Sequence, residues 1–92
     1  MDPHGKVALI TGGARIGQAV AHALARRGCH LALTYRESRA AAEATVAAVR
    51  AMGVKAEAFQ ADAREEAEVA SAVDRAVAGL GGIDILINMA SS

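Results

Sequence analysis

Aromatic side chains are almost missing from this sequence. Its 92 residues include no tryptophan, one phenylalanine and one tyrosine. Because 53% of the residues are nonetheless hydrophobic, a core has to be built from alanine, valine, isoleucine and leucine. These side chains bury little area each, so a chain of this length forms one small domain with a narrow margin of stability. We therefore treat residues 1–92 as a single domain.

Disulfides, metal sites, nucleic-acid binding and membrane spans are each disfavoured by something that the sequence lacks. Cys29 is the only cysteine, so we expect a small buried residue in a reducing, cytoplasmic setting. No His and Cys residues have metal-ligand spacing, and the three histidines are expected to have surface or packing roles. Ten basic and ten acidic residues cancel, which argues against a nucleic-acid partner. No apolar run approaches the roughly 20 residues of a membrane helix.

The stretch from Lys6 to Gly17, KVALITGGARIG, changes its pattern halfway along. Residues 7–10 form an apolar run typical of a strand buried on both faces, and after Gly12 and Gly13 apolar residues recur at helical spacing. A glycine-rich turn between strand and helix lets the backbone approach a pyrophosphate, whose charge the helix N-terminus attracts. The pattern predicts a phosphate-binding loop, and the alternative is a tight connection with no ligand.

The rest of the chain alternates between strand and helix patterns. The predicted elements after Gly17 and its helix are a strand at 30–35, a helix at about 38–52, a strand at 55–61, a helix from 62 towards 80 and a strand at 83–88. Ser38 is placed to cap the helix that follows it, and Asp62 with Glu65 has the spacing of a capping box. The inward face of the last helix is predicted at Val69, Val73, Ala76, Val77 and Leu80.

Strands that alternate with helices of about a dozen residues indicate parallel βαβ units with right-handed crossovers. The simplest arrangement is an α/β fold of Rossmann type. Its four-stranded parallel sheet has the order 3-2-1-4, with the first two helices on one face and the third on the other. The switch point then lies between strands 1 and 4, where a doubly wound sheet binds its ligand beyond the carboxyl ends of the strands. Residues 11–17 and 88–91 would both open onto this crevice.

Three motifs, in order and on the expected elements, resemble the short-chain dehydrogenase/reductase family over nearly the whole chain. Residues 11–17, TGGARIG, are similar to the family's Thr-Gly-x-x-x-Gly-x-Gly, although the loop is one residue short. Asp62 after the third strand resembles the family's adenine-contacting aspartate. Residues 88–91, NMAS, resemble its Asn-Asn-Ala-Gly turn, with Met89 in place of the second asparagine.

A finer likeness points to the pteridine reductase branch of that family. Arg15 stands before the Ile16-Gly17 pair, and residues 90–92 read Ala-Ser-Ser, as in that branch. Ser91 looks like the serine that faces both cofactor and substrate in pteridine reductases.

The end of the second strand bears on the choice between NAD(H) and NADP(H). NAD-dependent enzymes commonly place a carboxylate there to bind the ribose 2′-OH. Here the first charged residue after Tyr35 is Arg36, whose guanidinium suits a 2′-phosphate, and Ser38 adds a hydroxyl donor. Glu37 argues against this interpretation. The residues favour NADP(H) over NAD(H), and the alternative is a solvated charged turn.

The resemblance implies a dinucleotide site but no catalytic residues. The resemblance implies the family's chemistry, which is hydride transfer with a Tyr-x-x-x-Lys pair. The only tyrosine of this sequence, Tyr35, has no lysine four residues after it. We therefore interpret the chain as the N-terminal cofactor-binding part of a longer reductase, inactive alone. One alternative is a non-catalytic dinucleotide-binding module. The other is a remnant with no ligand, and the short glycine loop favours this last alternative. The predicted cofactor-binding residues are Gly12, Gly13, Arg15, Ile16, Gly17, Tyr35, Arg36, Ser38, Asp62, Ala63, Asn88, Ala90 and Ser91.

The last predicted strand, IDILIN at 83–88, would be central in the complete sheet of the family. In these 92 residues it becomes an edge, with apolar side chains on both faces and unpaired backbone groups. Burial worth about 25 cal/mol per Å² barely offsets the ordering cost in so small a domain. We expect a marginal monomer that pairs along this strand or aggregates.

Overall fold

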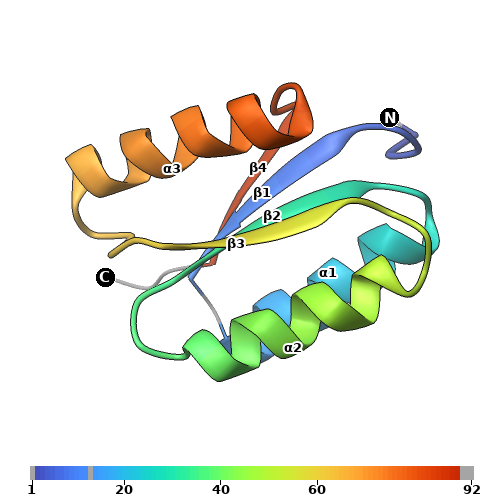
Figure 1. Ribbon diagram of the computed structural model, residues 1–92, viewed down its shortest axis with the longest axis horizontal. Coiled ribbons are helices and arrows are strands. Elements are labelled where there is room, and N and C mark those ends of the chain that lie inside the picture. The colour runs from blue at the N-terminus through green and yellow to red at the C-terminus, as the bar shows by residue number, and fades with distance from the viewer. Residues whose placement is uncertain (1, 13, 90–92) are drawn as a thin grey trace.

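A parallel four-stranded sheet runs through the middle of the molecule (Figure 1). The computed structural model describes residues 2–12 and 14–89, without the side chains of 14–16. In chain order the elements are β1 (Val7–Thr11), α1 (Ala14–Arg26), β2 (His30–Tyr35), α2 (Arg39–Arg50), β3 (Ala56–Gln60), α3 (Glu66–Leu80) and β4 (Ile85–Asn88). The strand order is β3-β2-β1-β4, and every neighbouring pair is parallel, which confirms the predicted topology.

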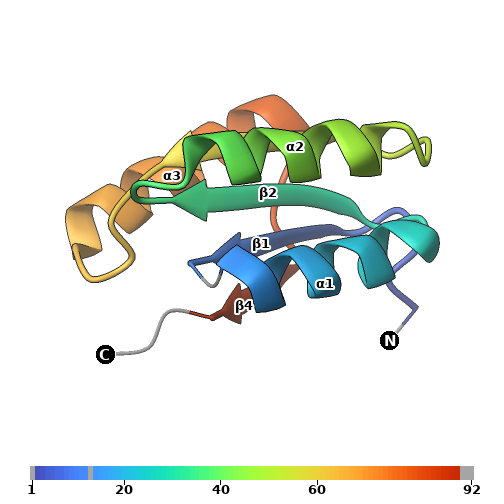
Figure 2. The same cartoon turned by 90° about the horizontal axis from the view of Figure 1, so that it is seen from below.

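The helices form a layer on each face of the sheet, as predicted. Figures 1 and 2 show α1 and α2 together on one face and α3 on the other. Alternate residues of the central strands supply the two cores, because side chains in a strand point to opposite faces. Ile10 and Leu33 pack toward α1 and α2, whereas Leu9 and Ala32 pack with Ala76 of α3. This double burial explains why β1 is apolar without interruption.

Two details at α3 differ from the prediction. The helix begins at Glu66 with Glu65 as its N-cap, so the predicted capping box of Asp62 and Glu65 is wrong. The Asp62 carboxylate is bound by Arg64 instead, within the turn that precedes the helix. Val77, predicted to face inward, is 44% exposed.

Small residues explain the position of the α3 contact face. Ala72 and Ala76 are fully buried against the sheet, whereas Val73 and Leu80 are only partly buried. A methyl side chain lets the helix approach the sheet closely, so the buried stripe follows the alanines rather than the larger valines. Ser38 does occupy the predicted N-cap position of α2, but its side chain makes no capping hydrogen bond.

The fourth strand lies at one edge of the sheet, as predicted. Among the described residues β4 pairs with β1 alone, while α3 packs over β1, β2 and β3. Ile85 and Ile87 are half-buried on the face of α1, and Leu86 on the other face is 63% exposed. None of the helices in the described ranges is long and apolar enough to cross a membrane.

Asp84 fastens the start of β4 to the start of β1. Its Oδ2 accepts a hydrogen bond of 2.9 Å from the backbone N–H of Val7. Its own backbone N–H donates to the Val7 carbonyl oxygen over 2.8 Å. This pair of bonds sets the register of β4 against β1, its one neighbouring strand in the part of the chain that the structure describes.

We expect Asp84→Ala to lower the free energy of unfolding by about 1 kcal/mol, because the Val7 N–H loses its side-chain acceptor. Asp74→Ala, an exposed aspartate on α3, is the matched control and should change that free energy by less than about 0.5 kcal/mol. Urea unfolding followed by circular dichroism measures both. Equal effects of the two substitutions would contradict this role for Asp84.

Candidate functional site

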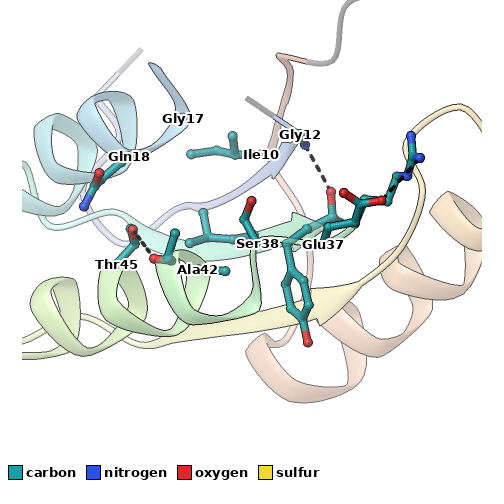
Figure 3. A pocket seen from close by; sticks show the side chains of 13 residues that line it. Ile10, Gly12, Gly17, Gln18, Glu37, Ser38, Ala42 and Thr45 are labelled. Atoms are coloured by element: carbon teal, nitrogen blue, oxygen red, sulfur yellow. Dashed lines mark hydrogen bonds and ion pairs between the residues drawn. The ribbon is translucent and has the colours of Figure 1, made fainter. Parts of the chain in front are cut away.

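A pocket of about 300 Å³ opens at the carboxyl ends of β1 and β2, between α1 and α2 (Figure 3). Its floor is apolar and its rim carries hydroxyl, amide and charged groups. The lining residues are Ile10, Gly12, Gly17, Gln18, Leu33, Thr34, Tyr35, Arg36, Glu37, Ser38, Ala41, Ala42 and Thr45.

The structure brings part of the predicted site to this pocket. The predicted residues that line it are Gly12, Gly17, Tyr35, Arg36 and Ser38. Asp62, Ala63 and Asn88 lie outside the lining, at the ends of β3 and β4. Gly13, Ala90 and Ser91 lie outside the described residues, and Arg15 and Ile16 fall in the first turn of α1, where side chains are not described.

The glycine loop brings the start of α1 close to the end of β1. Gly12 has a φ of 71°, a left-handed conformation that glycine adopts without strain. A Cβ on Gly17 would lie 3.1 Å from the Gly12 carbonyl oxygen and 3.5 Å from Cγ2 of Ile10. The absence of side chains at these positions therefore allows the helix and the loop to approach each other. Although the loop is short, α1 begins at Ala14 and its first turns border the pocket.

Hydrogen bonds join the carboxyl ends of three strands beside the loop. The Gly12 N–H donates to Oγ1 of Thr34 on β2 over 3.2 Å, as Figure 3 shows. The Thr11 hydroxyl donates to Oδ1 of Asn88 on β4 over 3.0 Å, and the Met89 N–H donates to the Thr11 carbonyl oxygen. These bonds hold the ends of β1, β2 and β4 in one fixed arrangement. Asn88, predicted to bind cofactor, thus has a structural contact as well.

Arg36 lies between two carboxylates at the end of β2. Its Nη2 is 3.5 Å from Oε1 of Glu37, and its Nε is 4.0 Å from Oδ2 of Asp62. Its side chain is 54% exposed. An incoming phosphate would therefore have to compete with Glu37 and Asp62 for the guanidinium. The ion pair with Asp62 also links the ends of β2 and β3, two strand ends that the sequence predicts at one site.

Arg64 holds Asp62 in its charged form. The Arg64 side chain donates to both carboxylate oxygens of Asp62, over 3.1 Å from Nε and 2.9 Å from Nη2. The Arg64 backbone N–H donates to Oδ1 over 2.9 Å. The side-chain bonds are the main reason that the pKa of Asp62 falls from 3.8 to about 2, and the backbone bond adds to them. Asp62 is therefore ionised throughout the neutral range.

Several lining residues were not found from the sequence. Thr34 carries a weak signal, a hydroxyl near the end of an otherwise buried apolar strand. Gln18 and Thr45 face each other from α1 and α2 (Figure 3), a proximity that depends on how the two helices pack. Helical periodicity marks the face of each helix but does not say which residues of two helices meet.

The arrangement suits a ligand that carries phosphate. The start of α1, the glycine loop and the Arg36 guanidinium lie around an apolar floor, an environment that favours an anionic nucleotide. Within residues 2–12 and 14–89 no group of three or more His, Cys, Asp or Glu side chains is placed to hold a metal ion.

Comparisons with known proteins agree with this interpretation. The short chain dehydrogenase family model matches residues 6–92. AacuN, a short chain dehydrogenase/reductase of Aspergillus aculeatus, is 45% identical over 87 residues, which cover 94% of this chain and 33% of that protein. A short chain dehydrogenase from Burkholderia cenocepacia, solved in complex with NADP, superimposes with a TM-score of 0.92 and 45% identity over 100% of this chain and 38% of that one.

The length of the match differs among relatives. The chain spans about a third of the curated relative AacuN but 84% of YusS, a short-chain dehydrogenase/reductase homolog of Bacillus subtilis that is 39% identical over 92 residues. The family match over residues 6–92, the strand order and the glycine loop together lead to one conclusion: the chain belongs to the short-chain dehydrogenase family.

Proposed function

We propose that the chain is the N-terminal, cofactor-binding part of an NADP(H)-dependent short-chain oxidoreductase, whose whole protein transfers hydride to a carbonyl or pterin-like substrate. The observation that carries this proposal is the pocket at the ends of β1 and β2, where Gly12, the start of α1 and Arg36 come together. The NADP complex of the Burkholderia cenocepacia relative supports a dinucleotide ligand.

Each part of the pocket has a proposed role in binding. The loop from Gly12 to Gly17 and the N-terminus of α1 receive the pyrophosphate, because the N–H groups of the first helical turn and the helix dipole favour negative charge. Arg36 and Ser38 bind the 2′-phosphate, beside Tyr35. Asp62, held in its ionised form, accepts a hydrogen bond from the adenine amino group. When bound, the nicotinamide supplies or accepts the hydride.

The remaining predicted residues complete the proposed site. Asn88 and Ala90 line the cofactor from the end of β4, and Ala63 follows Asp62 at the end of β3. Gly13, Arg15 and Ile16 belong to the pyrophosphate loop, and Ser91 faces cofactor and substrate. Arg15 and the Ala-Ser-Ser sequence at 90–92 support a pterin-like substrate through their likeness to pteridine reductases.

The 92 residues by themselves should bind without turnover. They contain no Tyr-x-x-x-Lys pair, so no side chain is available to supply the proton that accompanies hydride transfer. We propose that residues 1–92 act as one dinucleotide-binding domain. A cytoplasmic location accords with Cys29, which is buried with a free thiol.

A second candidate is a non-catalytic dinucleotide-binding module. The match to YusS favours this candidate, because the chain covers 84% of the length of that relative. Both candidates require dinucleotide binding, and they differ in whether the gene encodes a Tyr-x-x-x-Lys pair further along. The complete reading frame therefore decides between them.

Arg36→Ala should weaken NADPH binding about tenfold and leave NADH binding nearly unchanged, because a charge-assisted contact to the 2′-phosphate is lost. Arg39→Ala is the matched control, since Arg39 is an exposed arginine three residues away that pairs with Glu43 over 3.0 Å. Nicotinamide fluorescence measures both affinities without interference, because the chain has no tryptophan. If neither reduced dinucleotide binds the parent chain, the proposed function is wrong.

Glu37→Gln should have the opposite effect and tighten NADPH binding. The substitution removes a negative charge 3.5 Å from Nη2 of Arg36, so the guanidinium becomes a better partner for phosphate. Glu43→Gln, on the same helix face as Arg39, serves as the control. A fall in the NADPH to NADH selectivity of Glu37→Gln would mean that Arg36 does not bind the 2′-phosphate.

The pH dependence should separate the two oxidised dinucleotides. The pKa of Asp62 is lowered to about 2. The contribution of its carboxylate to dinucleotide binding is therefore present above pH 4 and is lost only as the pH falls toward 2. A phosphate monoester loses a negative charge below its second pKa of about 6. Calorimetric titration from pH 8 to about pH 5.5 should therefore show NADP⁺ affinity falling and NAD⁺ affinity flat, because the 2′-phosphate loses charge in this range while Asp62 stays ionised. A parallel fall for both would contradict this assignment.

A further inference from the structure

Two arginines approach the carboxylate of Asp62, and they hold it unequally. Arg64 reaches both oxygens, with hydrogen bonds of 3.1 Å from Nε to Oδ1 and 2.9 Å from Nη2 to Oδ2. Nε of Arg36 lies 4.0 Å from Oδ2, a distance at which opposite charges attract but no hydrogen bond forms. Asp62 is therefore bound firmly by Arg64, which is not among the residues that line the pocket, and only weakly by Arg36, which is.

The turn that follows β3 fixes this arrangement through its backbone. The Glu65 N–H donates to the Asp62 carbonyl oxygen over 2.9 Å, and the Arg64 N–H donates to Oδ1 of Asp62 over 2.9 Å. The Asp62 N–H donates in turn to Oε1 of Glu68 on α3, also over 2.9 Å. None of these bonds involves the Arg64 guanidinium, so a substitution of the Arg64 side chain should leave the turn in place.

The exposure of the two carboxylates beside Arg36 decides which of them competes more strongly for its guanidinium. The Glu37 side chain is 80% exposed, whereas the Asp62 side chain is only 20% exposed. Water screens an exposed ion pair more than a sheltered one. An Asp62 carboxylate without another partner would therefore hold Arg36 more tightly than Glu37 does. It follows that the Arg36 donors stay available because Asp62 is already bound by Arg64.

We propose that Arg64 is a positioning residue that sets the preference for NADP(H): by binding both oxygens of Asp62, it keeps that carboxylate from capturing the guanidinium of Arg36 that receives the 2′-phosphate. This inference rests on the proposed function, because it concerns the same site. Arg64 acts on the ligand through Asp62 and then through Arg36. The ligand that it favours is a nucleotide with a phosphorylated ribose, over the same nucleotide with a free 2′-hydroxyl.

Arg64→Met tests the proposal, because methionine keeps much of the side-chain length but has neither the charge nor the donors of arginine. The Asp62 carboxylate should then turn to Arg36, so that the ratio of NADPH affinity to NADH affinity falls about threefold, the scale of a partly exposed ion pair. Nicotinamide fluorescence measures both affinities, and circular dichroism shows that the variant is folded. A merely structural effect would change both affinities alike and leave the ratio as it was.

Two further variants separate this role from a general effect of charge. Arg75→Met is the matched control, since Arg75 is an exposed arginine of α3 that forms no ion pair within the described part of the chain, and it should leave the ratio nearly unchanged. Asp62→Asn removes the carboxylate through which Arg64 is proposed to act. In the Asp62→Asn background, Arg64→Met should therefore no longer lower the ratio.

Several results would overturn this inference and leave the proposed function standing. One is an affinity ratio that Arg64→Met does not lower. The others are a fall of the same size in Arg75→Met, or in the Asp62→Asn background, since either would mean that Arg64 acts through its own charge. If the parent chain binds neither reduced dinucleotide, the proposed function fails, and this inference fails with it.

Discussion

The burial of β1 between two helical layers is the constraint on which the rest of the structure depends. Residues 7–10 are buried on both faces, so both sides of the strand need neighbours and both faces need helices. With so few large side chains available, these layers come together through alanine and glycine. Ala21, Ala72 and Ala76 are fully buried where helices meet the sheet. Because all strands are parallel, the same packing gathers their carboxyl ends at one edge of the molecule.

At the carboxyl ends of the strands, side chains form hydrogen bonds that hold the end of β1. Thr34 accepts the Gly12 N–H, and Asn88 accepts the Thr11 hydroxyl, so the neighbouring strands hold the end of β1 in place. The charged groups beside it are also balanced, because Arg36 and Arg64 face Glu37 and Asp62. A site of this kind favours an anionic ligand only to the extent that the ligand outcompetes the local carboxylates. Selectivity among dinucleotides would then depend on this competition as much as on Arg36 itself.

Hydropathy periodicity predicted the elements, because it reflects which residues have to be buried. The right-handed crossover of βαβ units then predicted the strand order and the helices on each face. The failures have a common cause. Asp62 was assigned to a helix cap from spacing, but the neighbouring Arg64 offers a charge-assisted partner that the cap does not. Helical spacing predicted Val77 on the inward face, whereas helix and sheet make contact through Ala72 and Ala76. That Gln18 and Thr45 line the same pocket depends on how α1 packs against α2, which no local pattern of residues specifies.

We propose above all that the ends of β1, β2 and β3 form one dinucleotide site. Amide chemical shifts of the ¹⁵N-labelled chain, followed by NMR during titration with NADP⁺, test this most directly. We expect the amides of Gly12, Gly17, Arg36 and Asp62 to shift together along one saturation curve, while Gly28 and Gly53 at the opposite end of the sheet do not move. Shifts confined to that opposite end, or no shifts at millimolar NADP⁺, would contradict it.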